Sequence, residues 1–361
     1  MTTAIAGRML ISGYRWPVLD HLNAMTDDVG ILQHAHLDIP NRSCGYCTDD
    51  VGRALLIATD AARRFHEDRD SSRLMTTYLA YLHDAQQADG WFHNFMGYDR
   101  RWQDRSGSPD AIGRAIWGLG YAERFASKPS WSALAGAMRR RSLPAVARMD
   151  HLRSRAYAAL GLTHALGGNP DDKLALRAVL DDAVRPIAEA YDAHRAPDWD
   201  WCEDLMTYDN ARLPEALLRA GAQLGSERYV EAGLAMLRFY AGETIKHGTF
   251  YPVGNQGWYP RGGPKARFGQ QPLEAAALVD AALAAYDQTG EQMWRSVVEI
   301  AHAWYLGNNV HRVSLVSNGG CCDGLDAAGV NRNQGAESTV CYLMSAIALA
   351  NRSTLTLRVA Q

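Results

Sequence analysis

The sequence predicts an all-α protein in which six helical hairpins close into an (α/α)6 toroid, a single domain over residues 1–361. Three observations predict it. Ala/Leu/Gly-rich segments with few charges recur along the chain, each after a polar or acidic turn. Amphipathic segments alternate with them. The links into the apolar segments are mostly much longer than the links out of them. A repeated supersecondary unit of this kind stacks until its apolar faces are covered.

The six apolar segments are expected to form the inner helices. Helices that are apolar nearly all round are buried ones, and their small residues allow close packing against neighbours. We expect these helices to start near residues 48, 109, 150, 209, 270 and 335.

The amphipathic segments are expected to form six outer helices, because their charges lie on one face. They are found within residues 16–32, 71–88, 131–149, 171–194, 226–245 and 291–308.

Long links of this kind usually carry function in a compact domain. Here they run over residues 89–107, 195–207, 246–269 and 309–333. All of them lead into inner helices, so they lie at the end of the toroid where six helix N-termini offer free N–H groups and partial positive charge. The site is expected at this end.

Composition excludes several classes of protein. A net charge of −3 over 361 residues gives no basic footprint for nucleic acid or anionic membrane. No apolar run is long enough for a signal peptide or a membrane span, so the expected location is the cytoplasm. Phosphate-binding loops, zinc spacings and nucleophile elbows are missing, and no cofactor is indicated.

The long links are rich in aromatic rings, amides and carboxylates. Aromatic rings can stack on the apolar face of a sugar while polar groups bind its hydroxyls. The expected ligand is therefore an oligosaccharide or polysaccharide. The candidate substrate-binding residues are Trp91, His93, Asn94, Trp102, Arg114, Trp199, Trp201, Tyr208, Arg212, Trp258, Tyr259, Gln271 and Gln334.

Carboxylates are the best catalytic groups available, and cleavage of a glycosidic bond needs two of them, an acid and a base or nucleophile. The preferred arrangement has Glu203 as acid and Asp104 or Asp110 as base, with inversion of configuration. The full candidate set is Asp50, Asp104, Asp110, Glu203, Asp209 and Glu337.

A structural role competes with catalysis for several of these acids. Asp49, Asp50, Asp110 and Asp209 are expected in the first turns of helices, where acids cap N–H groups and complement the dipole. Each also precedes an arginine by about one turn (Arg53, Arg114 and Arg212), which favours local ion pairs. Glu274 and Glu337 lie deeper in their helices. There, an inward-pointing acid has a raised pKa unless it pairs with an inner arginine.

The cysteines and histidines form no pattern typical of a metal site or a redox motif. Closure of the toroid brings the last hairpin beside the first, so Cys321 and Cys322 approaching Cys44 and Cys47 is one possible zinc site. The adjacent Cys-Cys spacing disfavours it, and packed thiols are preferred. No metal is predicted.

Several loop motifs resemble a bacterial group of six-hairpin glycosidase-like proteins that are often encoded near, or fused to, glycosyltransferases. The motifs are "MTDDVGILQHA", "GYCTDDVGRAL", "FHNFMGYDRRWQDRSGSPDAIGRAIWGLG", "WDWCEDLMTYDNARLPEAL" and "GGCCDGLDAAGVNRNQGAESTVCYLMSA". The resemblance covers nearly the whole chain. It implies an (α/α)6 toroid and a carbohydrate substrate, and it carries no catalytic assignment over to this sequence.

Three functions remain open at this point. A glycoside hydrolase leads. A sugar epimerase or isomerase would use histidines such as His93 or His247, and a lyase is related to it. A non-catalytic carbohydrate-binding partner of a glycosyltransferase would use the same aromatic-lined cleft.

Overall fold

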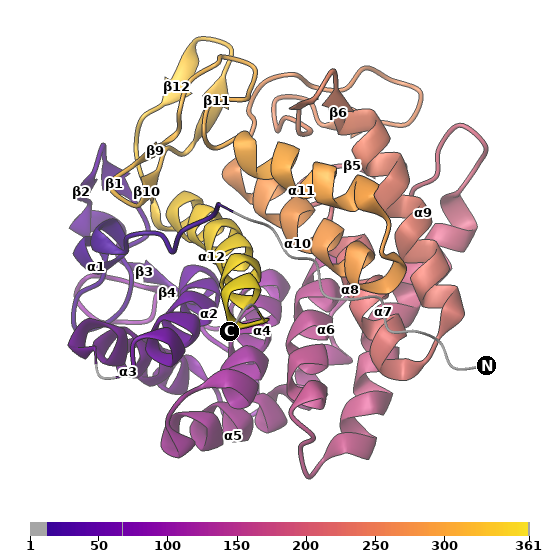
Figure 1. Ribbon diagram of the computed structural model, residues 1–361. Helices are drawn as coiled ribbons and strands as arrows, with labels where there is room; N and C mark the ends of the chain where they lie inside the picture. Colours follow the sequence, from indigo (N-terminus) through magenta and orange to yellow (C-terminus); the bar gives the residue numbers. More distant parts are fainter. Residues whose placement is uncertain (1–12, 67, 360–361) are drawn as a thin grey trace.

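The computed structural model describes residues 13–66 and 68–359, with side chains described through residue 353, and it is an (α/α)6 toroid (Figure 1). Each of the six inner helices contacts the next, and the last contacts the first. The ring is therefore closed. The inner helices are α2 (Thr48–Arg64), α4 (Pro109–Phe125), α6 (Leu152–Gly167), α8 (Arg212–Leu224), α10 (Pro272–Thr289) and α12 (Ala336–Val359).

Five long helices form the outer layer, and the first outer element is much shorter than expected. The five are α3 (Arg69–Ala85), α5 (Pro129–Val146), α7 (Lys173–His194), α9 (Glu227–Thr244) and α11 (Gln292–Ala303). The segment 16–32 forms only α1 (Asp20–Met25). It stops because Thr26 is extended and Asp27 turns the chain, accepting hydrogen bonds from the backbone N–H groups of Val29 and Gly30.

Glycines bring neighbouring inner helices into backbone contact. A Cβ on Gly120 in α4 would lie 2.0 Å from the carbonyl oxygen of Gly161 in α6, and a Cβ on Gly118 would lie 2.2 Å from that of Gly52 in α2. Real Cβ atoms do not approach an oxygen this closely. The small residues of the inner helices therefore set the narrow spacing of α2, α4 and α6.

The long links lie at the end of the toroid where the inner helices begin, which we call the N-terminal pole. These links and the segment 33–47, which leads into α2, carry short antiparallel strand pairs. The pairs are β1 (Ala35–His36) with β2 (Ile39–Pro40), β3 (Tyr46–Cys47) with β4 (Phe95–Met96), β5 (Leu205–Met206) with β8 (Tyr259–Pro260), β6 (Ile245–Lys246) with β7 (Thr249–Phe250), β9 (Val316–Ser317) with β10 (Gly320–Cys321), and β11 (Gly324–Asp326) with β12 (Gly329–Asn331).

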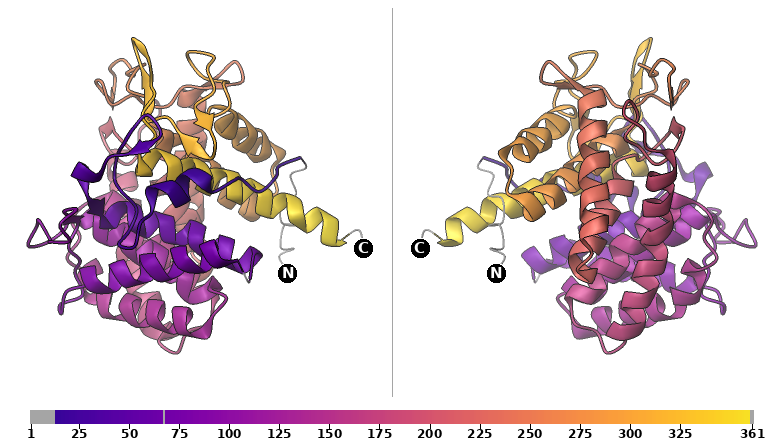
Figure 2. Two further views of the ribbon diagram at one scale, coloured as in Figure 1. Left: turned by 90° about the vertical axis from the view of Figure 1, so that its left-hand side faces the viewer. Right: turned by 90° about the vertical axis from the view of Figure 1, so that its right-hand side faces the viewer.

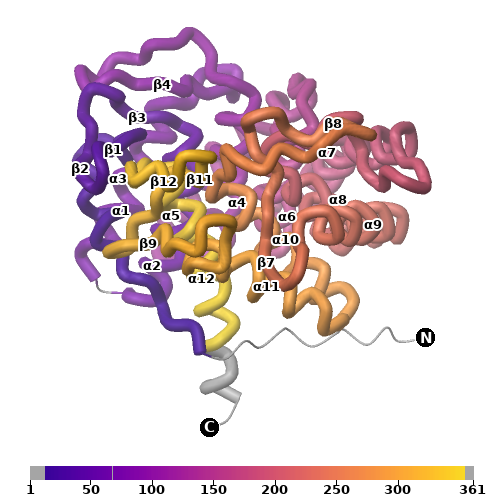
Figure 3. Tube along the Cα trace, turned by 90° about the horizontal axis from the view of Figure 1, so that it is seen from above, coloured from indigo at the N-terminus to yellow at the C-terminus, as the bar shows by residue number. Residues whose placement is uncertain are grey.

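Two of these pairs, β3 with β4 and β5 with β8, join different links and so tie the pole together. Figure 3 shows β3, β4 and β8 on one side of the molecule and the far end of α12 on the other. That opposite end, where the inner helices finish and the links are short, is the C-terminal pole. Figure 2 shows α12 projecting from it. No helix among the described residues has the length and apolarity needed to cross a membrane.

Candidate active site

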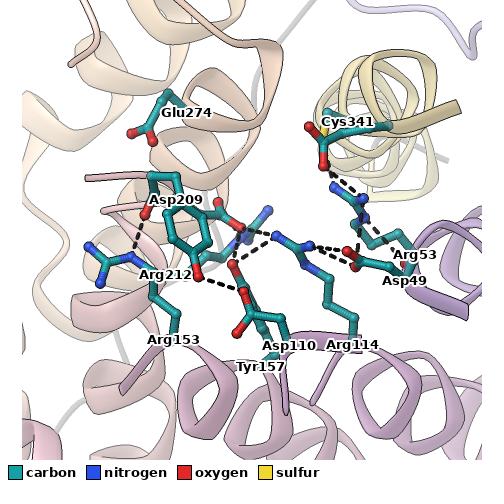
Figure 4. Close-up of polar contacts among 12 residues, drawn as sticks. Asp49, Arg53, Asp110, Arg114, Arg153, Tyr157, Asp209, Arg212, Glu274 and Cys341 are labelled. Carbon is teal, nitrogen blue, oxygen red and sulfur yellow. Dashed lines mark hydrogen bonds and ion pairs between the residues drawn. The ribbon is translucent and has the colours of Figure 1, made fainter. Parts of the chain in front are cut away.

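Carboxylates and arginines from all six inner helices meet at the N-terminal pole in a network that we call the polar cluster (Figure 4). Its members are Asp49, Asp50, Arg53, Asp110, Arg114, Arg153, Tyr157, Asp209, Arg212, Glu274, Glu337 and Cys341. Every helix supplies its residues from its first turns, except that Asp209 stands just before α8. The helix starts therefore aim these groups at the axis of the ring.

Asp50 lies at the buried edge of the cluster, where α2 meets α12. Its Oδ1 accepts a hydrogen bond from Arg53 Nη2 at 2.8 Å, and the Cys47 thiol donates to its Oδ2 at 3.2 Å. The same Arg53 nitrogen reaches Glu337 Oε2 at 3.0 Å. Cys47 also caps α2, because its sulfur accepts the backbone N–H of Asp50. Cys47 is thus part of the site through its two contacts with Asp50, a hydrogen bond to the carboxylate and a cap on the backbone N–H.

Asp49 faces the opposite side of the same helix turn, toward α4. Arg114 Nη1 donates to its Oδ1 at 2.6 Å and its Oδ2 at 2.7 Å, and Arg114 Nη2 donates to Asp209 Oδ2 at 3.3 Å. The Tyr157 hydroxyl donates to the same Asp209 oxygen at 2.7 Å. The expected local pair of Arg114 with Asp110 is therefore wrong, since the guanidinium crosses to neighbouring helices.

The adjacent acids Asp49 and Asp50 have pKa values pushed in opposite directions. Burial alone would raise the pKa of Asp49, but the charges of Arg114 and then Arg53 outweigh it and lower the pKa below its ordinary value. Burial raises the pKa of Asp50 to about 7; Arg53 opposes the rise, and the charges of Asp49 and Glu337 add to it. Such a split is how environment assigns one carboxyl to proton donation and another to the ionised state.

Asp110 is held as an acceptor rather than as a helix cap. The Tyr208 hydroxyl donates to its Oδ2 at 2.6 Å, and the Ser154 hydroxyl donates to its Oδ1. Ser108 caps α4 in its place. The capping role expected for the acids of these first turns is therefore filled by other side chains in both α2 and α4.

Glu203 and Glu274 lie on the far side of the cluster, linked through Asn210. Arg153 Nη1 donates to Glu203 Oε1 at 2.9 Å, whereas Glu203 Oε2 is buried without a partner among the described residues. Arg153 Nη2 donates to Asn210 Oδ1 at 3.2 Å, and Asn210 Nδ2 donates to Glu274. Burial raises the pKa of Glu274 to about 7, opposed by the hydrogen bond from Tyr240.

A separate group sits in the 89–107 link. The ring of His93 stacks on Trp102 with centroids 5.0 Å apart, and its Nδ1 lies 3.4 Å from Asp104 Oδ1. Asp104 Oδ2 accepts the backbone N–H of Asn94 at 2.7 Å. The closer contact of His93 Nδ1 is the backbone carbonyl oxygen of Asp104, at 2.9 Å. A histidine ring held in this way is a candidate for proton transfer.

Several candidate wall residues are not placed to touch a substrate. Trp199 and Trp201 are buried, with exposed fractions of 2% and 0%, because the 195–207 link folds inward and packs them against Phe239 and Tyr240. Their expected role in stacking on sugar is wrong. Arg212 is a buried member of the cluster, and its guanidinium is held in ion pairs with other side chains.

The remaining wall candidates keep some exposure or a polar role. Trp91, Trp102, Tyr208, Trp258, Tyr259 and Gln271 are partly exposed, and Asn94, Arg114 and Gln334 are buried polar residues at the same pole. The Tyr259 hydroxyl donates to Glu243 at 2.8 Å. Trp91 lies under Arg148.

The six cysteines are free thiols, and no three His, Cys, Asp or Glu side chains among the described residues form a group that could hold a metal ion. Glu337 is ion-paired to an inner arginine and 40% of its side chain is exposed, so the buried acid expected there is wrong and the salt-bridge alternative holds.

Five residues of the cluster were not predicted from the sequence. Cys341 was passed over, Asp49 and Arg53 were interpreted as a helix-start pair, and nothing was predicted for Arg153 and Tyr157. A usable signal existed for the last two. They stand four residues apart, on one face of an inner helix, and a buried polar residue there must find a partner inside the ring.

Comparison with known proteins supports the fold. No protein-family model matches the sequence. No curated protein sequence matches it either. Among solved structures, the chain is similar to a cellobiose 2-epimerase from Spirochaeta thermophila (10% identity, 94% of each chain covered, TM-score 0.71). It is similar to a D-mannose isomerase (9% identity, 92% of this chain and 96% of that one, TM-score 0.68).

The chain is also similar to a GH76 α-mannanase from Bacteroides thetaiotaomicron, with 13% identity, 93% of this chain and 95% of that chain covered, and a TM-score of 0.62. At these identities the likeness establishes the toroid and nothing finer. It does not single out the group associated with glycosyltransferases.

Proposed function

We propose that the protein is a glycoside hydrolase that cleaves an oligosaccharide or polysaccharide at the N-terminal pole. The observation that carries the proposal is the pair of adjacent acids Asp49 and Asp50, whose pKa values are driven apart within a cluster of carboxylates and arginines. Histidine is absent from this cluster as the described residues form it. Carboxylate chemistry is therefore favoured over imidazole chemistry.

In the proposed mechanism Asp50 is the general acid. With a pKa of about 7 it holds a proton near neutral pH and can give it to the leaving glycosidic oxygen. Asp49, kept ionised by Arg114 and Arg53, is the base that activates water. Glu203 was the preferred acid on sequence grounds, but its ion pair with Arg153 suits a base or a hydroxyl-binding group better.

Inversion of configuration at the anomeric carbon is part of the proposal. Side chains at consecutive helix positions diverge by about 100°, so Asp49 and Asp50 do not face each other. The proposal needs a water between acid and base, as inverting enzymes do. The configuration of the first product, followed by proton NMR, tests this, and a retained anomer would overturn it.

The main experiment is mass spectrometry of purified protein incubated with a panel of bacterial oligosaccharides. Shorter products are expected from the wild-type protein and from Glu203→Gln at reduced rate, and none from Asp50→Asn. Full activity in Asp50→Asn would remove the proposed acid. If products were lost only in Glu203→Gln, the general acid would be Glu203, in the 195–207 link, as first predicted.

A sugar epimerase or isomerase is the second candidate, favoured by the Asp104–His93 pair with its stacked Trp102. It predicts deuterium uptake from heavy water into an intact sugar, abolished by His93→Gln. A lyase would instead yield a product with a new double bond, visible by its absorbance. Ligand bound and recovered unaltered would favour the non-catalytic partner of a glycosyltransferase.

A further inference from the structure

A cavity lies at the C-terminal pole, away from the polar cluster. Its volume is about 460 Å³, within the range of small-molecule sites. All six inner helices contribute to the wall. A smaller cavity of about 140 Å³ adjoins it and shares Arg124, His164, Arg219 and Asp287. The two together form one hollow across the ends of α4, α6, α8 and α10.

The wall of the larger cavity is charged, and nearly all of its charges are matched. Four carboxylates and four arginines line it. Each of the carboxylates contacts a guanidinium: Asp60 with Arg63 at 2.9 Å, Glu215 with Arg219 at 2.7 Å, Asp280 with Arg212 at 2.8 Å, and Asp287 with Arg352 at 2.6 Å.

Arg124 is the one lining arginine that makes no ion pair with a carboxylate of the described residues. Its guanidinium lies over the ring of Phe125, 4.7 Å from the centroid, and against the end of α6, where a Cβ on Gly167 would be 2.0 Å from its Nη1. The side chain is exposed. The neighbouring His164 adds no charge, because burial, then Arg219 and Arg124, hold its pKa well below the ordinary value.

Arg124 is thus a cation of the wall that lacks an anionic partner among the described residues, and it suits a ligand with acceptor oxygens. The fixed carboxylates Asp60 and Asp287, beside the rings of Tyr121 and Phe125, suit hydroxyls and the apolar face of a sugar.

We propose that this cavity is a second binding site, for a small polyhydroxylated anion of the sugar phosphate or sugar acid type. Arg124 holds the anionic group, and the matched charges of the wall hold the hydroxyls. The site is independent of the proposed hydrolase chemistry, since it shares no lining residue with the acids of the N-terminal pole.

Isothermal titration calorimetry on the full chain tests the proposal, with glucose 6-phosphate, glucuronate, glucose and inorganic phosphate as probes. At least one of the two anionic sugars is expected to bind at least tenfold more tightly than glucose and than inorganic phosphate. Which of the two binds identifies the anionic group. Arg124→Ala should weaken that binding at least tenfold, and Arg124→Lys should recover part of it.

Two controls locate the binding. Arg141→Ala removes another exposed arginine, on the outer helix α5, that lines neither cavity, and it should leave the affinity unchanged. Asp50→Asn should also leave it unchanged. The proposal is overturned by the absence of binding at millimolar probe, by unaltered affinity in Arg124→Ala, by inorganic phosphate binding as well as the sugar anions, or by loss of binding in Asp50→Asn.

Discussion

The two poles of the toroid contain the same residue types, carboxylates and arginines, in different arrangements. At the N-terminal pole, Asp49 and Asp50 stand in a cluster that leaves one acid ionised and the other protonated near neutral pH. At the C-terminal pole, each of the four carboxylates that line the cavity contacts a guanidinium. Unequal environments create reactive groups, whereas matched pairs create a rigid polar wall. In the two proposals above, the difference separates a catalytic site from a binding site within one ring of helices.

Arg212 stands between the poles. It reaches Asp209 of the polar cluster at 3.6 Å, and Glu215 and Asp280 toward the cavity at 2.6 and 2.8 Å. Its guanidinium lies over Trp117, whose ring stacks in parallel on Tyr157. The axis of the toroid is thus filled by charged and aromatic side chains, and the poles are separate sites rather than one channel.

The largest expected effect is on catalysis at the N-terminal pole. Asp50→Asn should lower kcat by about 10²- to 10⁴-fold, the usual contribution of a general acid. In the wild-type protein kcat/KM should fall above about pH 7, because Asp50 must be protonated to donate. A pH–rate profile measures both. Residual activity in Asp50→Asn that still fell at the same pH would assign the titration to another group.

Removing the arginine between the poles should have the largest effect on stability. Arg212→Ala leaves the buried Asp280 without its ion-pair partner and Glu215 with Arg219 alone, which costs about 3–5 kcal/mol. Arg219→Ala provides a comparison, because Arg219 is more exposed and Glu215 keeps Arg212. In urea unfolding, the free energy of unfolding of Arg212→Ala should be well below that of Arg219→Ala. Equal loss in the two variants would mean that the matched wall, not the axis, holds the ring together.

The pH dependence of stability offers a finer test of the N-terminal pole. Burial raises the pKa of Glu274 to about 7, so the folded state binds its proton more tightly than the unfolded chain. The free energy of unfolding should therefore fall as pH rises from about 4 to about 7. Glu274→Gln should remove on the order of 3 kcal/mol of that fall. Glu227→Gln, exposed on α9, should leave it intact, and an unchanged fall in Glu274→Gln would contradict the assignment.

The spacing between inner helices can be tested at one glycine. Gly120→Ala places a Cβ against the backbone of Gly161, which cannot move aside, and should cost about 1–3 kcal/mol by overpacking. Gly242→Ala on α9, where a Cβ meets nothing within 4 Å, should instead stabilise by about 0.5–1 kcal/mol through helix propensity. Thermal unfolding that ranked them the other way would refute the close contact.

Sequence patterns could predict the ring of helices but not which charged side chains pair with one another inside it. Apolar periodicity and link lengths indicated the closed toroid and the pole with long links. They also suggested that Arg114 pairs with Asp110, because local helix pairs are all that spacing shows. Such pairs contribute only about 0.2–0.5 kcal/mol, and the two close bonds from Arg114 to Asp49 depend on how α2 and α4 are rotated.

The sugar-stacking role predicted for Trp199 and Trp201 is wrong for a related reason. Their link is polar and Trp-rich, and nothing in its spacing says which rings turn inward. The sequence did not indicate the C-terminal cavity either, because its wall is made of residues near the ends of six helices joined by short links.

The smallest expected change in stability is at the C-terminal pole, and it separates stability from binding. A Cβ on Gly167 would meet the tip of the Arg124 side chain, which can swing away, so Gly167→Ala should change the free energy of unfolding by no more than about 0.5 kcal/mol. The displaced guanidinium should nevertheless bind the anionic sugar more weakly, by calorimetry. Gly120→Ala, on the neighbouring helix α4, should lose stability yet keep that affinity. If Gly167→Ala bound the anion as tightly as the wild-type protein, the position of Arg124 would not matter, and the binding pole would need a different cation.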